Sequence, residues 1–219
     1  HDSGFPSLSI DFVLKKAGLK ADDVDWVVFY EKPFLKFERI IKTSLETFPR
    51  APSVFRESIK HLFLDKLWIR YLISSELKIS PRKILFSNHH LSHAASAFFC
   101  SPYDKAAILT VDGVGEWTTT ALSIGEGNKI KILKEVHFPD SLGLLYSAFT
   151  AFLGFEVNEG EYKVMGMAPY GNPRYAGKVK KMIEFAEDFS FRLNPGYFSF
   201  QKSLSETFSD KMVELFGPP

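Results

Sequence analysis

"KAAILTVDGVGEWTTTALSIGEGNKIKILKEVHF" occupies residues 105–138 and decides the fold class of this chain. Three strand-like runs of apolar and β-branched residues are separated by glycines, first at Gly113 and Gly115 and then at Gly125 and Gly127. Short glycine turns of this kind join neighbouring antiparallel strands. The stretch therefore predicts a three-stranded β-meander.

Helices and further strands are expected on both sides of the meander. "DVDWVVFYEK" (23–32) predicts a buried strand, and "KILFSN" (83–88) predicts a strand that leads directly into a histidine-rich segment. Apolar spacing predicts helices at residues 7–17, 34–48, 53–78, 141–155 and 175–187, and short strands are expected near 189–191 and 197–200. Ser7 and Ser141 are expected to cap the first and the fourth of these helices. Residues 158–175 are rich in glycine and proline and predict a loop.

The order of these elements predicts an α/β protein with mixed sheets flanked by helices. The sequence changes near residues 100–106 from helix-rich to strand-rich. We therefore expect two subdomains, residues 1–105 and residues 106–219.

Composition and charge limit the classes of function. The 219 residues carry a net charge of +1 at pH 7, so nothing predicts a polyanion-binding surface, and nucleic-acid binding is not expected. A single cysteine excludes an intramolecular disulfide and is typical of a reducing compartment, so we expect a cytoplasmic protein without a secretory signal. The longest relevant uncharged run, residues 141–155, is shorter than the ~20 residues that a membrane span needs.

Half of the six histidines lie in "FSNHHLSHAASAFF", residues 86–99. On a helix, His89 and His93 share one face, one turn apart, whereas His90 points about 100° away. Imidazoles at this spacing can share a metal ion, because neutral histidine is a common metal ligand. The alternative is a pair of histidines that cap the helix or hydrogen-bond the backbone and bind nothing.

Asp112 follows the apolar run that ends at Val111 and begins the turn "DGVGE". A carboxylate at the end of a strand is held rigidly, and the backbone amides of Gly113 and Gly115 can approach an anion. An ordinary β-turn is the alternative, since Asp-Gly is a common turn dipeptide. Together with His89 and His93, however, Asp112 forms a set of two imidazoles and one carboxylate, which favours iron or zinc.

The segment "NEGEYKVMGMAPYG", residues 158–171, is a third candidate site. A carboxylate of Glu159 or Glu161 can bind a ribose hydroxyl, and Lys163 can bind a phosphate. The alternative is an ordinary surface loop, although the segment is unusually apolar for one. No Walker A, GxGxxG, HExxH, GxSxG or CxxC pattern occurs, which argues against a P-loop, a Rossmann dinucleotide site and a zincin.

In this combination the blocks resemble the carbamoyltransferases of the nodulation, cephamycin and tobramycin type. The resemblance is carried by "HHLSHAASAFFCSPYDKAAILTVDGVGEW", "HFPDSLGLLYSAFTAFLGF" and "NEGEYKVMGMAPYGNPRY", and upstream by "HDSGFPSLSIDFVLKKAGL" and "VVFYEKPFLKFER". It implies a partial fold of the actin/hexokinase/Hsp70 (ASKHA, RNase H-like) type, similar to the universal tRNA threonylcarbamoyl-transferase.

The resemblance also implies a function and its site residues. In this family a YrdC-like domain makes carbamoyl-adenylate from carbamoyl phosphate and ATP, and the carbamoyl group then passes to the hydroxyl of a small-molecule acceptor at a divalent metal, here Fe²⁺ or Zn²⁺. By motif, His89, His93 and Asp112 match the metal ligands. The residues that match the nucleotide-binding region are Gly113, Gly115, Asn158, Gly160, Glu161 and Lys163.

Members of the family are usually much longer, so we expect this chain to be a fragment without transferase activity of its own. Two other functions stay open. One is a protein similar to the tRNA threonylcarbamoyl-transferase, which the balanced charge disfavours because RNA binding usually needs a basic stripe. The other is a non-catalytic module that binds nucleotides.

Overall fold

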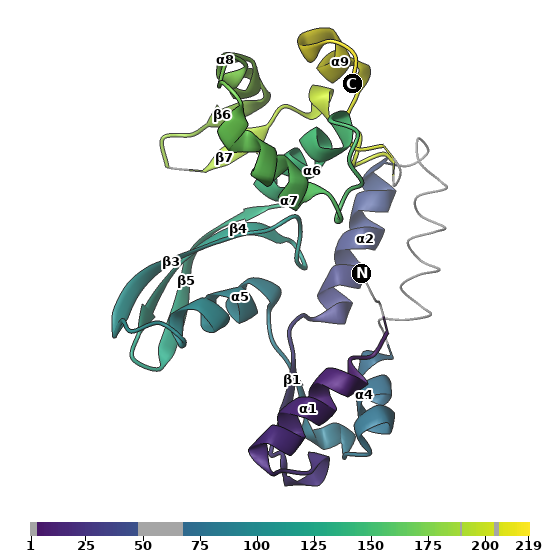
Figure 1. The fold of residues 1–219 in the computed structure, drawn as a ribbon, viewed down its shortest axis with the longest axis vertical. Coiled ribbons are helices and arrows are strands. Elements are labelled where there is room, and N and C mark those ends of the chain that lie inside the picture. The colour runs from purple at the N-terminus through teal and green to yellow at the C-terminus, as the bar shows by residue number, and fades with distance from the viewer. Residues whose placement is uncertain (1–3, 48–67, 189, 204–205) are drawn as a thin grey trace.

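The computed structural model describes residues 4–47, 68–188, 190–203 and 206–219. Within these residues the chain forms helices and small sheets, which confirms the predicted α/β class. Three groups of elements follow one another along the long axis of the molecule (Figure 1). None of the described helices has the length and apolar character that a bilayer crossing requires.

The first group is built around two parallel strands. Its elements are α1 (Ser7–Ala17), β1 (Val27–Phe29), α4 (Ile69–Leu77) and β2 (Ile84–Phe86). Ile73, Ile79 and Ile84 form its buried core. The expected strand at β1 is present, but Val28 is 59 % exposed, because alternate residues of a strand point to opposite faces and the described elements leave its side of the sheet uncovered.

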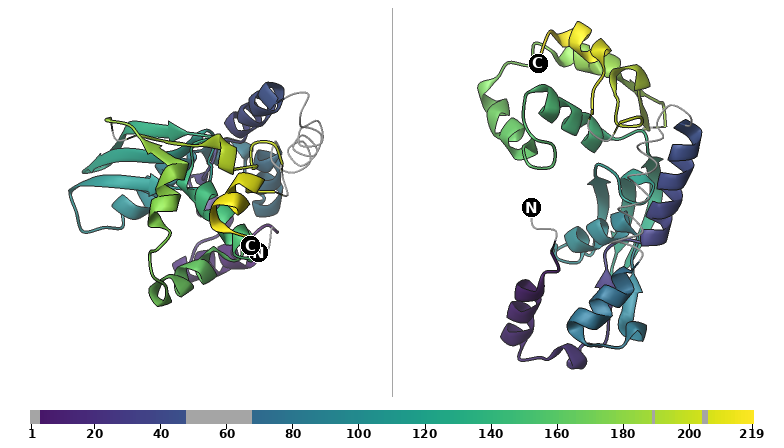
Figure 2. Two further views of the ribbon diagram at one scale, coloured as in Figure 1. Left: turned by 90° about the horizontal axis from the view of Figure 1, so that it is seen from above. Right: turned by 90° about the vertical axis from the view of Figure 1, so that its right-hand side faces the viewer.

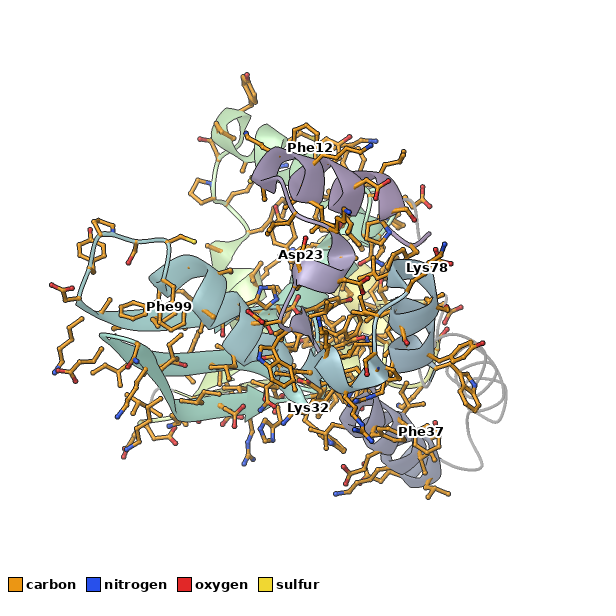
Figure 3. All side chains as sticks on the ribbon, turned by 90° about the horizontal axis from the view of Figure 1, so that it is seen from below. Phe12, Asp23, Lys32, Phe37, Lys78 and Phe99 are labelled. Atoms are coloured by element: carbon orange, nitrogen blue, oxygen red, sulfur yellow. The ribbon has the colours of Figure 1, made fainter. Side chains whose placement is uncertain are left out.

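The helices in and beside this group agree only in part with those expected. Gly18 ends α1 in the left-handed conformation, but Ser7 lies inside the helix, and Pro6 takes the capping position that we expected for it. No residue of α1 is buried, and Phe12 lies on its outward side (Figure 3). The long α2 (Pro33–Thr47) confirms the helix expected at 34–48 and runs along one side of the molecule (Figure 2). Of the helix expected at 53–78, the structure shows α4, and residues 53–67 lie outside the described residues.

The second group contains the predicted meander. Its elements are α5 (His89–Phe98), β3 (Lys105–Val111), β4 (Thr118–Glu126) and β5 (Lys129–His137). The three strands are antiparallel in the order β3-β4-β5, and the second turn lies at Gly127. Gly125 lies within β4 instead of the turn, and a Cβ atom there would come 2.7 Å from the Phe98 ring. The glycine therefore lets α5 pack closely on the sheet.

Helix α5 covers one face of this sheet (Figure 1), where Ala94, Phe98 and Ile108 form a buried cluster. The predicted boundary between residues 1–105 and 106–219 falls inside β3, after its first residue. Because α5 precedes the boundary and packs on the strands that follow it, this layer joins the two predicted subdomains.

The third group lies above the other face of the meander in Figure 1. Its elements are α6 (Leu142–Phe152), α7 (Glu161–Met167), α8 (Ala176–Val179), β6 (Ile183–Phe185), β7 (Phe191–Leu193) and α9 (Asp210–Phe216). As expected, the Ser141 hydroxyl caps α6 by accepting from the Leu144 amide. Ala148, Phe152, Met182 and Met212 belong to its buried core.

Three expectations for this group are wrong. Residues 158–175 are not all loop, because glutamate, lysine and methionine favour the short helix α7. The helix expected at 175–187 stops after α8, because Ile183–Phe185 instead pairs with β7, and this pairing overrides the helical pattern. The strand expected at 197–200 is reduced to a single bridge between Phe198 and Phe208.

Candidate metal centre

The first turn of α5 is held by a carboxylate that the sequence reasoning missed. His89 is the first residue of the helix, and the side chain of Asn88 does not cap it. Instead the buried Glu116 side chain accepts from the His89 amide at 3.1 Å and from the Lys32 amide at 2.8 Å. A carboxylate at a helix N-terminus is favoured by the helix dipole. Glu116 ends the "DGVGE" turn, and that position is the only signal for it in the sequence.

Asp112 is fixed from the opposite side. It follows the last residue of β3, and its amide donates to the Thr119 carbonyl at 2.9 Å. The hydroxyl of the fully buried Ser141 donates to the Asp112 and Gly113 carbonyls at 3.1 and 2.6 Å. The start of α6 and the edge of the meander thus hold the Asp112 backbone in place.

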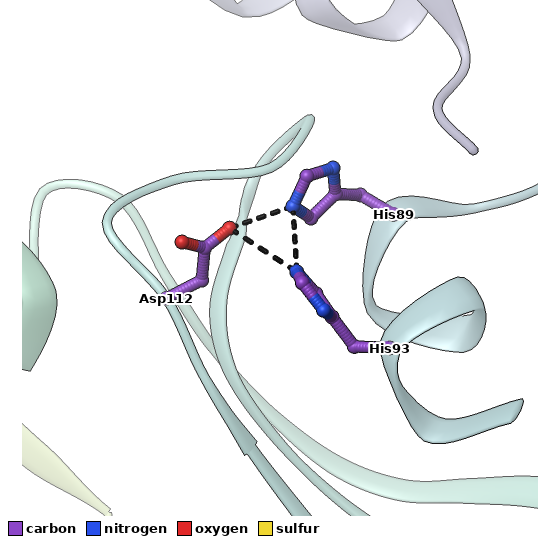
Figure 4. Close-up of side chains that lie close together, drawn as sticks. All are labelled: His89, His93 and Asp112. Carbon is purple, nitrogen blue, oxygen red and sulfur yellow. Dashed lines mark hydrogen bonds and ion pairs between the residues drawn. The ribbon is translucent and has the colours of Figure 1, made fainter. Parts of the chain in front are cut away.

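The structure brings the three predicted metal ligands together. The Nε2 atoms of His89 and His93 are 3.0 Å apart, and the Asp112 Oδ2 atom lies 2.6 Å from the first and 3.7 Å from the second (Figure 4). The His89 side chain is 14 % exposed and the His93 side chain 51 % exposed. The cluster is therefore anchored on its inner side and accessible from solvent on the other.

These separations fit a single cation. Ligands about 2.1 Å from one metal ion lie roughly 3.0 Å apart at octahedral angles and roughly 3.4 Å apart at tetrahedral angles. The three observed separations of 2.6, 3.0 and 3.7 Å bracket both values. Two imidazoles and one carboxylate on one triangular face leave the remaining positions of an ion open, as in catalytic iron and zinc sites.

The Asp112 carboxylate is kept in the form that a metal requires. The hydrogen bond with His89 is the main influence, and it lowers the pKa of Asp112 far below its usual range. Burial opposes this shift, while the Gly113 amide, which donates to Oδ1 at 2.7 Å, supports it. The carboxylate therefore stays ionised and can bind a cation.

His90 points away from the cluster, as the helical spacing predicts. Its Nε2 atom donates to the Thr118 carbonyl at 2.9 Å, and its Nδ1 atom pairs with the Thr110 hydroxyl at 2.7 Å. Burial is the main reason why the pKa of His90 is lowered. This histidine is a buried structural residue that joins α5 to β3 and β4.

The two turn glycines make different contacts from those expected. The Gly113 amide donates to Asp112 Oδ1, and the Gly115 amide donates to the Thr118 carbonyl at 3.0 Å. Both amides that we expected to bind an anion thus already donate within the turn. A Cβ atom on Gly115 would come 2.9 Å from the His89 Cβ atom, so this glycine leaves room for the His89 side chain.

A cavity of about 800 Å³ adjoins the metal cluster. Asp112 and Gly113 line it together with Asn158, which precedes α7, and Glu161, the first residue of α7. Burial raises the pKa of Glu161, but hydrogen bonds outweigh it, so that the net pKa is lowered. Two of the donors are the Asn158 amide at 3.0 Å and the Ser147 hydroxyl at 2.9 Å, both bound to Oε1.

Gly160 and Lys163 are not among the residues that line this cavity. Gly160 precedes α7, and a Cβ atom there would come 2.6 Å from the Phe155 Cβ atom, so the turn needs a glycine. The Lys163 Nζ atom lies 5.7 Å from the centre of the Phe155 ring and 5.9 Å from that of Tyr162. Among the predicted nucleotide-binding residues, the structure thus groups Gly113, Asn158 and Glu161 around one cavity.

Comparison with known proteins places the chain in a family. Residues 1–219 match the family described as "Carbamoyltransferase N-terminus". The chain is 45 % identical to the uncharacterized protein sll1178 of Synechocystis over all of its own length and 37 % of that protein. It is 37 % identical to the nodulation protein NolNO of Sinorhizobium fredii over 88 % of its length and 27 % of that protein.

The nodulation protein NolO of Bradyrhizobium diazoefficiens is 37 % identical over 49 % of the chain and 20 % of its own length. The chain thus spans 37 % or less of each of these three relatives. Because the match to the family extends along the whole chain, this protein belongs to the carbamoyltransferase family and corresponds to its N-terminal part.

Proposed function

We propose that this chain forms the metal-binding and nucleotide-binding part of an O-carbamoyltransferase. In this proposal a carbamoyl group passes from carbamoyl-adenylate to the hydroxyl of a small-molecule acceptor, which loses its proton while AMP leaves. A YrdC-like domain supplies the adenylate from carbamoyl phosphate and ATP, with release of phosphate and pyrophosphate. Membership of the carbamoyltransferase family supports it. The parallel β1–β2 pair and the β3-β4-β5 meander are compatible with the partial actin/hexokinase/Hsp70 type of fold that the proposal includes.

The observation that carries the proposal is that Asp112 belongs both to the metal cluster and to the wall of the cavity. Its Oδ2 atom faces the two histidines, and the same residue lines the cavity that Asn158 and Glu161 also line. A ligand in this cavity therefore lies next to the metal cluster. Its volume of about 800 Å³ is within the usual range for small-molecule sites.

The residues present suit carbamoyl transfer. A divalent cation at His89, His93 and Asp112 would polarise the carbamoyl carbonyl and lower the pKa of the acceptor hydroxyl. The Glu161 Oε1 atom already accepts two hydrogen bonds, which fix the side chain at the cavity wall, where a carboxylate can accept from a ribose hydroxyl. The protein otherwise has to align the two reactants and keep water from the adenylate.

The proposal is tested by nucleotide binding. The ¹⁵N-labelled chain is titrated with a non-hydrolysable ATP analogue in the presence of Zn²⁺, and backbone amide shifts are recorded. We expect the largest changes at Ser147, Asn158 and Glu161, and a weaker interaction in the Asp112→Asn variant. Saturating analogue that leaves these amides unchanged, or that moves only residues elsewhere, would contradict the proposed site.

A test of activity follows from the length of the relatives. We expect the 219-residue chain alone to form no carbamoylated product from carbamoyl phosphate, ATP and a hydroxyl acceptor, because this chain covers only part of each relative's length. Detection of such a product by mass spectrometry would refute this expectation. A chain that binds the nucleotide analogue but no metal ion would instead favour the non-catalytic module that binds nucleotides.

A further inference from the structure

His89 has one ring nitrogen in the metal cluster and one outside it. Its Nε2 atom faces Asp112 and His93, while its Nδ1 atom is buried and has no hydrogen-bond partner among the described residues. When Nε2 of a histidine binds a metal, the ring proton must be on Nδ1. That N–H group then needs an acceptor, because a buried donor without one has lost its hydrogen bonds to water and gained none in return.

One carboxylate lies on that side of the ring. The Glu31 Oε2 atom is 3.9 Å from His89 Nδ1, and the Glu31 side chain is almost completely buried. The distance is about 1 Å longer than an N–H···O hydrogen bond, so a small movement of either side chain would close it. Buried carboxylates on the outer nitrogen of a metal-binding histidine are a frequent arrangement, because they fix the ring and strengthen the ligand.

Three contacts of the neighbouring residues hold Glu31 next to α5. The residue before it, Tyr30, accepts at its carbonyl from the Ser92 hydroxyl at 3.0 Å, and its ring lies 5.6 Å from that of His89. The residue after it, Lys32, donates its amide to Glu116, which also accepts from the His89 amide. The segment between β1 and α2 is therefore fastened to the same helical turn that carries His89.

The charge of Glu31 is balanced within the protein. The Lys36 Nζ atom lies 3.0 Å from the Glu31 Oε2 atom, and the buried Arg39 side chain interacts electrostatically with the same carboxylate. A buried acid that also has two cations near it can remain in place whether or not a metal is bound. The same Glu31 Oε2 atom thus pairs with Lys36 and lies within reach of His89 Nδ1.

We propose that Glu31 is the positioning residue of the metal centre, which accepts from His89 Nδ1–H and so orients the Nε2 atom toward the cation. This inference rests on the proposed function, because it assumes that the histidine pair and Asp112 bind a metal. It assigns no direct contact with metal or substrate to Glu31. Its effect on the metal passes through the orientation of the His89 ring, whereas its contacts with Lys36 and Arg39 serve the fold.

The first test compares Zn²⁺ affinity in this chain, measured by competition with a chromophoric chelator. We expect Glu31→Gln to weaken Zn²⁺ binding roughly 10-fold, since loss of such an outer carboxylate typically costs 10–100-fold. Glu38→Gln is the matched control, because it removes the same charge from an exposed position of α2, and we expect less than a twofold change. Equal affinities of Glu31→Gln and the wild type would overturn the inference and leave the metal site standing.

The second test reads the His89 ring directly, by long-range ¹H–¹⁵N NMR of the Zn²⁺-loaded chain. In the wild type we expect the Nδ1 proton of His89 to be shifted downfield and slow to exchange. In Glu31→Gln the His89 Nδ1 signal should move while the His93 ring signals stay in place, which a general loss of stability would not produce. A rapidly exchanging Nδ1 proton in the wild type would overturn the inference even if the variant failed to fold. Failure of the wild type to bind Zn²⁺ would instead overturn the proposed metal site, and this inference with it.

Discussion

The two sides of the candidate site are built in different ways. On the metal side, His89 and Asp112 are tied to buried groups, Glu116 and Ser141, that belong to other elements. On the nucleotide side, the short helix α7 contains no buried residue, and Tyr162 is 65 % exposed. Rigid support suits ligands that must meet one ion within a few tenths of an ångström, whereas an exposed helix suits a surface that a ligand covers on binding. The comparison predicts that substitutions on the metal side change ligand affinity and the free energy of unfolding more than substitutions on the nucleotide side do.

The largest expected effect is the loss of a metal ligand. We expect His93→Ala to weaken Zn²⁺ binding at least about 100-fold, because a missing ligand should cost more than the 10–100-fold typical of an outer-sphere change. His137→Ala is the matched control, since the His137 side chain is 55 % exposed and that of His93 51 %. Elemental analysis of both purified variants measures the difference. Equal metal content in the wild type and His93→Ala would count against the assignment.

Two glycines sharpen the contrast in rigidity. A Cβ atom on Gly143 would come 2.5 Å from the Asp112 backbone, so Gly143→Ala must displace the start of α6 or the Asp112 turn. We expect this substitution to lower the free energy of unfolding by about 1–3 kcal/mol. A Cβ atom on Gly166, within α7, meets nothing within 4 Å. Gly166→Ala should therefore raise the free energy of unfolding, by about 0.5–1 kcal/mol, through helix propensity.

Urea unfolding of the wild type and both glycine variants checks this pair. If Gly143→Ala were as stable as Gly166→Ala, the metal side would not be rigidly packed, and the contrast between the two regions would be lost.

The smallest effects on ligand affinity are expected from substitutions on the nucleotide side. Glu161→Gln should weaken binding of the ATP analogue roughly 2–10-fold, which corresponds to the 0.5–1.5 kcal/mol of a typical hydrogen bond. Lys163→Met should change it less than Glu161→Gln does, because Lys163 lies against aromatic rings and does not line the cavity. Calorimetric titration of the two variants gives both values. A larger loss in Lys163→Met would mean that Lys163 reaches a phosphate, as the sequence predicts.

The sequence predicts the metal side better than the nucleotide side, for a physical reason. Helical spacing places His89 and His93 on one face, and a strand end holds Asp112, so that each expectation follows from local geometry. The contact between Asp112 and the two histidines also requires α5 to pack against β3. The apolar pattern of the sequence indicates that both elements have a buried face, but not that these faces meet. Glu116 and Glu31 are missed because their roles depend on contacts with residues 27 and 58 positions away.

On the nucleotide side, glycine gives ambiguous signals. Gly113 and Gly115 suit an anion-binding turn, but in the structure their amides donate within the turn, and Gly115 makes room for His89. Gly160 likewise fits the turn against Phe155. A glycine can serve a close approach of the protein to itself as well as to a ligand, and only the three-dimensional neighbours separate the two uses.

The central claim is that His89, His93 and Asp112 hold one divalent cation at the edge of the cavity. Anomalous diffraction at the zinc edge, from crystals of this chain grown with Zn²⁺, tests it most directly. The claim predicts one strong peak about 2.0–2.2 Å from both Nε2 atoms and from an Asp112 carboxylate oxygen. Zinc bound only at other positions, with these three side chains free of metal, would contradict it.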